Sequence, residues 1–298
     1  MDFMKWYRRM DYWRSNHRHM WQERTERERL LQYLDTAELD DVDELKSFFS
    51  KNRFWYIPYE WALEKNFPNP RVDFDEQKKM YYADWHGKKL YWRKGDRKKD
   101  VRKCVRTLSI EQHEKSPHRY NLPANLKGAV IADVGAAEGC FTLDVVDQIS
   151  HAYLFECDEA WIEPLIATFA PWKEKVTIVK KFVGNQADDT FITLDEYFKD
   201  KPLDFIKADI EGAELDMLSS GVETLRCKVS CVNVCLYHRD TDEAEITSLL
   251  RNCGYSCKVN PGYMFFHGSD DPGNWVCHSK NPKDWFRRGV VKAERILQ

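Results

Sequence analysis

The chain has 298 residues, of which 43% are hydrophobic and 14% aromatic, and this length predicts one large domain with a smaller one beside it. Its net charge of −3 gives it no overall basic field, which argues against a large nucleic-acid footprint. The N-terminus has no apolar signal-peptide core, and no window holds 18 uninterrupted apolar residues, so we expect neither a secretory signal nor a membrane span. Nine cysteines, an odd number in a chain without a signal, fit reduced thiols in a cytoplasmic protein.

Helical patterns dominate the start of the chain. Aromatic residues recur every three to four positions over residues 3–34 and predict a helix. Residues 35–50 predict a second, acidic amphipathic segment, whose apolar positions are Leu45, Phe48 and Phe49. We therefore expect the chain to be mostly helical up to about residue 80.

An aromatic hairpin and a further helix are expected next. The stretch MYYADWHGKKLYWRK, residues 80–94, predicts two short strands around a turn at His86 and Gly87. A helix is expected from Arg97 to His113, because Val101, Val105 and Leu108 fall on one face. A loop containing SPHRY then leads into the rest of the chain.

From residue 127 short apolar runs alternate with helical patterns, which predicts β-α-β units and a mostly parallel sheet. The main strand candidates are AVIADVG, AYLFECD, a run within TFAPWKEKVTIVKKF, LDFIKAD and VSCVNVCLYH, with YSCKVN, YMFF and WVCHS as shorter ones. This change divides the chain into a mainly helical N-terminal accessory region, residues 1–112, and a main domain, residues 113–298.

A glycine turn, IADVGAAEGCF, follows the first of these strands and opens a helix, which is the context of a cofactor-binding turn. Its pattern is Asp133, Gly135 and Gly139, whereas a nicotinamide-binding turn would have G-x-G-x-x-G. Glu138 would repel a pyrophosphate and attract an ammonium group, so an amino-acid head group suits the turn better than a dinucleotide. The alternatives are a turn that merely closes a β-α unit and a nicotinamide-dependent oxidoreductase.

The second strand ends at Glu156, which lies 21 residues after Gly135. An α/β nucleotide-binding fold places the acid that binds the ribose hydroxyls at about this distance. An adenosine joined to an amino acid is S-adenosylmethionine, so turn and acid together predict this cofactor.

Five motifs together resemble the FkbM-type methyltransferases: DVGAAEGCF, LFECD, TLDEYF, FIKADIEGAELDML and VCLYHR, over roughly residues 113–266. The resemblance implies an α/β class I methyltransferase fold, with a Rossmann-like, seven-stranded, mostly parallel sheet. It also implies an S-adenosylmethionine-dependent enzyme that O-methylates sugars or other small-molecule hydroxyls. The expected partner is thus a small-molecule or glycan acceptor rather than nucleic acid.

The resemblance also implies roles for individual residues. The methionine end of the cofactor would lie against the turn residues Asp133, Gly135, Ala136, Glu138 and Gly139; the ribose would contact Glu156; and adenine would lie near Phe182, Val183 and Asn185. The loop residues His118 and Tyr120 would sit at the open face and bind the acceptor. The chain departs from the family at Ala137 and Glu138, where many members have Asn nearby, and at Leu236, where an acid is frequent.

Polar side chains at the ends of the fourth and fifth strands are the catalytic candidates, because strand ends of an open α/β sheet share one crevice. Asp209 would face the methyl group or the acceptor hydroxyl, although it could simply cap the next helix. His238 is the expected base and Glu211 would orient the acceptor, whereas Glu214 fits the positive end of a helix dipole. Asp209, Glu211 and His238 could also bind Mg²⁺ or Mn²⁺, but no metal motif is intact and no metal is assigned.

Two further features invite functional readings. Cys227, Cys231 and Cys235 are spaced four apart, but a strand would separate the outer two by roughly 26 Å, so we expect small core side chains rather than a metal cluster. Residues 88–106 carry ten Lys or Arg and two Asp. This basic, aromatic stretch suggests, as an alternative, an RNA or other nucleic-acid methyltransferase, while a solvated charged face explains it equally.

Overall fold

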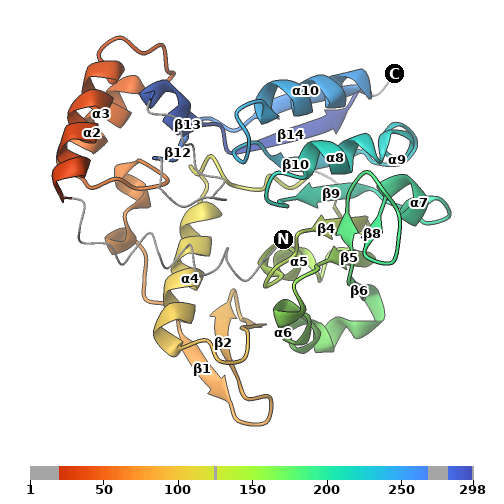
Figure 1. Ribbon diagram of the computed structural model, residues 1–298. Coiled ribbons are helices and arrows are strands. Elements are labelled where there is room, and N and C mark those ends of the chain that lie inside the picture. Colours follow the sequence, from red (N-terminus) through yellow and green to blue (C-terminus); the bar gives the residue numbers. More distant parts are fainter. Residues whose placement is uncertain (1–19, 124–125, 268–280, 297–298) are drawn as a thin grey trace.

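A seven-stranded sheet forms the centre of the computed structural model, which describes residues 20–123, 126–267 and 281–296 (Figure 1). Its strand order is β11-β14-β10-β9-β4-β5-β6. All strands run parallel except β14, which is antiparallel to both neighbours. The strands are β4 (Val130–Val134), β5 (His151–Phe155), β6 (Val176–Val179), β9 (Phe205–Ala208), β10 (Cys231–Cys235), β11 (Tyr255–Val259) and β14 (Val290–Arg295). The predicted seven-stranded, mostly parallel class I fold is confirmed.

Helices cover both faces of the sheet, which explains why its central strands are buried along their whole length and mainly apolar. Ile131 of β4 packs with α5 and α6, whereas its neighbours Ala132 and Val134 pack with the helices of the opposite face. On β10, Cys231 and Cys235 are both buried on the face with α5 and α6 and act as the predicted small core side chains. The prediction was wrong for Cys227, which is exposed at the end of α9, because the strand begins only at Cys231. The covering helices are α5 (Cys140–Val145) and α6 (Glu159–Phe169) on one face, and α7 (Leu194–Phe198), α8 (Glu214–Ser219), α9 (Val222–Cys227) and α10 (Asp242–Asn252) on the other.

The C-terminal strands differ from the prediction. The sequence pattern missed β14, because only Val290, Val291 and Ala293 are apolar and charged residues interrupt them. Pairing with β10 on one side and β11 on the other makes this segment a strand. The predicted strand YMFF is β12 (Met264–Phe265), which pairs with β13 (Phe286–Arg287) outside the main sheet. The predicted strand WVCHS lies outside the described residues.

The N-terminal elements largely follow the prediction, although the helix expected over residues 3–34 is described only from residue 20. The hairpin turns at His86 and Gly87, as expected, but an additional strand, β1, makes it three-stranded. Leu45, Phe48 and Phe49 are buried, as predicted. The elements are α2 (Met20–Leu34), α3 (Val42–Lys51), η2 (Glu60–Ala62), η3 (Glu64–Asn66), β1 (Val72–Asp75), β2 (Met80–Trp85), β3 (Lys88–Tyr91) and α4 (Lys98–Glu111).

Apolar cores cross the predicted boundary between residues 112 and 113. Helices α2 and α3 pack against Phe265 and Trp285, which come from β12 and from η5 (Pro282–Trp285) near the C-terminus. Trp85 and Val101 pack with the α5 and α6 face of the sheet. Figure 1 accordingly shows β12 and β13 between the helices α2 and α3 and the strand β14 of the sheet. The division into two domains stays a prediction.

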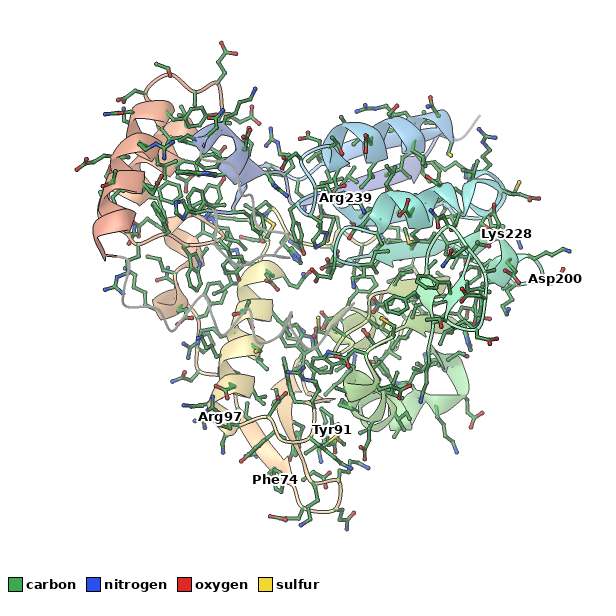
Figure 2. The ribbon with its side chains drawn as sticks, in the orientation of Figure 1. Phe74, Tyr91, Arg97, Asp200, Lys228 and Arg239 are labelled. Carbon is green, nitrogen blue, oxygen red and sulfur yellow. The ribbon has the colours of Figure 1, made fainter. Side chains whose placement is uncertain are left out.

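The remaining short elements are η4 (Ala170–Lys175) and the paired strands β7 (Phe182–Val183) and β8 (Phe191–Ile192). Figure 2 shows Phe74, Tyr91 and Arg97 together at the end of the molecule formed by the three-stranded sheet and the start of α4. Among the described residues, no helix has both the length and the hydrophobicity to cross a membrane.

Candidate active site

A cavity lies at the carboxyl ends of β4, β5 and β9, with α4 as one wall. It brings together most of the predicted site residues: His118, Tyr120, Gly135, Ala136, Glu138, Glu156, Val183, Asp209 and Glu211. Four predicted residues do not line it: Asp133, Gly139, Asn185 and His238. Six carboxylates and two lysines face the cavity, namely Glu111, Glu138, Glu156, Asp158, Asp209, Glu211, Lys181 and Lys207.

The glycine turn brings β4 against the end of β9. Gly135 has a φ of 75°, in the left-handed region, and a Cβ placed on it would lie 2.0 Å from the backbone oxygen of Asp209. The backbone N–H groups of Gly135 and Ala136 both donate to the Phe155 carbonyl, at 3.0 and 3.1 Å. The absence of a side chain at Gly135 therefore permits the close approach on which the cavity depends.

Two residues predicted to contact the cofactor instead support the turn. The Asp133 carboxylate is fully buried, accepts a hydrogen bond from Thr142 at 2.7 Å and pairs with Lys207 at 3.1 Å. Lys207 also donates to the Gly135 carbonyl at 2.7 Å, so this ion pair holds the turn from behind. Gly139 caps α5 with a φ of 84°. A Cβ there would lie 2.7 Å from the Phe169 ring, so this glycine serves helix packing.

Glu156 closes the cavity at the end of β5. Its carboxylate accepts hydrogen bonds from the backbone N–H groups of Ala137 at 2.7 Å and Asp158 at 2.8 Å, one on each oxygen. Burial raises the pKa of Glu156, and burial likewise raises that of Glu138 on the opposite side of the turn. Val183 lies in the wall beyond Glu156, whereas Asn185 is exposed and outside the cavity.

Asp209 is the centre of the polar network. Its two carboxylate oxygens accept hydrogen bonds from Tyr120 at 2.8 Å and Tyr237 at 3.0 Å, and His118 Nε2 lies 3.5 Å away. Burial opposes ionisation, but hydrogen bonding by His118 and the positive charge of His238 outweigh it and hold the pKa of Asp209 well below its usual range. Asp209 is therefore an anion fixed in place by residues from two other segments of the chain, the loop with His118 and Tyr120 and the end of β10 with Tyr237 and His238.

His238 lies behind Asp209 and Glu211, next to α8. Its Nδ1 is 2.9 Å from Glu214 Oε1, and Glu214 is fully buried. Burial disfavours the charged imidazole, but Glu214, Glu211 and Asp209 together raise the pKa of His238 to about 10. Arg287 donates to the carbonyls of Tyr237 and His238 at 2.8 Å each and fixes the segment that follows β10. The sequence predicted that Glu214 interacts only with the helix dipole, and its contact with His238 was not predicted.

Glu211 has an unusual backbone for its residue type. Its φ of 59° lies in the left-handed region, which costs a non-glycine residue roughly 1–2 kcal/mol. Burial and the nearby charges of Asp209 and Glu214 outweigh the opposing effect of His238 and raise the pKa of Glu211 to about 8. The side chain is 19% exposed and faces the cavity.

The sequence pattern missed two cavity residues, Glu111 and Tyr237. Glu111 is the last residue of α4, and burial, with Asp209 and Glu138 nearby, raises its pKa to about 7 despite opposition from His118. The sequence pattern did not single out Glu111, because the periodicity of the apolar residues in α4 explains this helix without a functional role for any of its charged residues. Tyr237 directly precedes His238, and its position at a strand end was the signal that could have identified it.

The strand order and the cavity at the strand ends define the class I methyltransferase fold. The family profile of the methyltransferase FkbM domain matches residues 90–257, more than half of the chain. The chain therefore belongs to the FkbM methyltransferase domain family. A search of curated proteins found no match.

Several solved structures are similar in fold. The methyltransferase FkbM from Methylobacillus flagellatus aligns over 65% of this chain and 52% of its own, with 17% identity and a TM-score of 0.45. This chain thus spans about half the length of that protein. An rRNA methylase from Streptococcus thermophilus aligns over 58% of this chain and 90% of its own, with 12% identity and a TM-score of 0.37. Magnesium protoporphyrin IX methyltransferase from Synechocystis aligns over 58% and 72%, with 11% identity and a TM-score of 0.37.

Proposed function

We propose that the protein transfers the methyl group of S-adenosylmethionine to a hydroxyl of a carbohydrate or glycan acceptor. The observation that carries this proposal is the meeting of the glycine turn, Glu156 and Asp209 in one cavity within the matched FkbM domain. Cofactor-holding residues occupy one side of that cavity. Residues able to bind and orient a hydroxyl occupy the other.

The residues of the cofactor side fit S-adenosylmethionine. Each oxygen of Glu156 accepts one backbone N–H and keeps a lone pair for a ribose hydroxyl. Glu138 faces the cavity and would attract the ammonium group, and Phe182 with Val183 offers an apolar wall for adenine. When bound, the cofactor supplies a methyl group carried on a sulfonium cation. A cavity whose charged lining residues are six carboxylates and two lysines suits such a cation.

The acceptor side is arranged around Asp209. Methyl transfer depends chiefly on positioning, and Tyr120, Tyr237 and His118 hold the Asp209 carboxylate rigidly at the cavity wall. His238 does not line the cavity, so we assign it no contact with the acceptor; its positive charge favours the ionised form of Asp209. Glu111 lines the cavity from α4, and we assign it the role of the base that accepts the proton of the acceptor hydroxyl.

The acceptor class is supported by the family and by charge. A cavity with more carboxylates than lysines would repel a phosphorylated acceptor, including nucleic acid. Acids within the structure pair with part of the basic stretch and reduce its attraction for a phosphorylated acceptor. Lys88 lies 2.8 Å from Asp147 and Lys94 lies 2.5 Å from Glu163. This distribution of charge favours an uncharged, hydroxyl-rich acceptor over RNA.

Mass spectrometry of surface polysaccharides from cells with and without the gene tests the acceptor class. We expect a methylated sugar of the glycan to lack its methyl group, a mass difference of one CH₂, in cells without the gene. Unchanged glycans together with a missing methyl group in RNA would overturn the carbohydrate assignment.

With the acceptor in hand, Glu111→Gln is expected to lower kcat about a hundredfold to a thousandfold, because the hydroxyl loses its proton acceptor. The wild-type rate should rise with pH through about 7, where Glu111 loses its proton, and this rise should vanish in the variant. The matched control is Glu114→Gln, which changes an exposed glutamate three positions later. A pH profile that keeps its shape in Glu111→Gln would exclude Glu111 as the base.

A further inference from the structure

The Nε2 atom of His238 points between the carboxylates of Asp209 and Glu211 and makes a hydrogen bond to neither of them. Nε2 lies 3.6 Å from Asp209 Oδ1 and 3.6 Å from Glu211 Oε2, beyond ordinary hydrogen-bond distance. The residue is 4% exposed, and within the described part of the chain neither ring nitrogen makes a hydrogen bond of ordinary geometry, although Nδ1 lies in ion-pair contact with Glu214. A buried polar atom of this kind normally has a partner, so the arrangement calls for a further group between the three side chains.

The other ring nitrogen shows how the imidazole is oriented. Nδ1 faces Glu214 Oε1 at 2.9 Å, and the same oxygen accepts the Ile210 backbone N–H at 2.8 Å. A carboxylate behind one nitrogen, with the other nitrogen turned to an open site, is the usual support of a metal-binding histidine. Glu214 therefore turns the Nε2 atom toward Asp209 and Glu211.

The two carboxylates are supported in a similar way. Tyr237 and Tyr120 each donate a hydrogen bond to Asp209, and hydrogen-bonded carboxylates are typical of metal ligands. Asp209 and Glu211 both line the cavity. One ligand atom from each of Asp209, Glu211 and His238 lies within 4.8 Å of the others, close enough to surround a single ion.

We propose that Asp209, Glu211 and His238 bind a divalent cation at the acceptor side of the cavity. Two carboxylates offset its charge, and the imidazole completes a three-ligand set. Carboxylates suit Mg²⁺ and Mn²⁺, and imidazole favours Mn²⁺ over Mg²⁺, so Mn²⁺ is the better probe. Three protein ligands leave coordination positions open toward the cavity, where an acceptor hydroxyl could bind and become more acidic. That role rests on the proposed function; cation binding itself does not.

Titration of the full chain with Mn²⁺ after treatment with a chelator, followed by electron paramagnetic resonance, tests the proposal. We expect one Mn²⁺ per chain, and at least about tenfold weaker binding in Glu211→Gln and in His238→Gln. Glu214→Gln should weaken binding about tenfold to hundredfold through its hold on His238. The matched control, Glu243→Gln, changes an exposed acid on α10 and should bind as the wild type does.

Binding of S-adenosylhomocysteine to the same proteins separates this proposal from the proposed function. Glu211 is partly exposed, so Glu211→Gln should fold, and circular dichroism checks that it does. The cation site is refuted if the wild type binds no Mn²⁺, or if the variants bind it equally well. Mn²⁺ binding without S-adenosylhomocysteine binding would keep the cation site and reject the methyltransferase assignment.

Discussion

Asp209→Asn is expected to lower methyl transfer about a thousandfold while leaving the affinity for S-adenosylhomocysteine nearly unchanged. The Asp209 carboxylate is the fixed charge around which Tyr120, Tyr237 and His118 are arranged. An amide keeps the shape but removes the charge and presents N–H groups where an oxygen accepted hydrogen bonds. The cofactor side of the cavity does not depend on this carboxylate, so its affinity should persist.

Glu156→Ala should show the opposite behaviour. It removes the acid assigned to the ribose, and we expect the affinity for S-adenosylhomocysteine to fall about tenfold to hundredfold, the value of hydrogen bonds to a charged group. Calorimetric titration measures both variants, with Asp200→Asn, an exposed acid at the edge of the molecule in Figure 2, as the control. An equal loss of affinity in Asp209→Asn and Glu156→Ala would contradict the division of the cavity into two sides.

Gly135→Ala is expected to lower the free energy of unfolding by more than the backbone strain of a left-handed alanine accounts for. A left-handed φ costs an alanine about 1–2 kcal/mol. The new Cβ would also lie 2.0 Å from the Asp209 carbonyl oxygen, so β4 and β9 must move apart, at roughly 1–3 kcal/mol more. The displacement widens the cavity between Glu138 and Asp209, so binding of S-adenosylhomocysteine should fall as well.

Gly128→Ala is the matched control for this experiment. Gly128 has nearly the same φ, 77°, but a Cβ placed there meets nothing within 4 Å. Its cost should be the backbone strain alone, with cofactor affinity unchanged. Urea unfolding measures the free energy of unfolding of each variant. An equal loss in the two variants would show that the structure accommodates a Cβ at Gly135 without further destabilisation.

The sequence predicts the parts of the molecule that local patterns encode. The apolar runs of β4, β5, β9 and β10 are visible because the sheet is buried on both faces, and their ends mark Glu156, Asp209 and Glu211. The strand β14 was not visible, because its pairing partners, rather than its own residues, make it a strand.

Side-chain roles were harder to predict where they depend on distant contacts. The glycine-turn pattern includes Asp133, but only the fold reveals Lys207 as its partner. Glu111 joins the cavity because α4 packs over the strand ends, which no spacing within α4 indicates. Glu214 has the composition of an ordinary first helical turn, and its contact with His238 depends on the end of the neighbouring strand.

Thermal unfolding with S-adenosylhomocysteine or NAD in excess tests the central claim most directly. A ligand present at a hundred times its dissociation constant stabilises the folded state by about 2.7 kcal/mol. We predict that S-adenosylhomocysteine raises the melting temperature and that Glu156→Ala reduces the effect, whereas NAD leaves the melting temperature unchanged. A shift with NAD and none with S-adenosylhomocysteine would contradict the assignment of this cavity to methyl transfer.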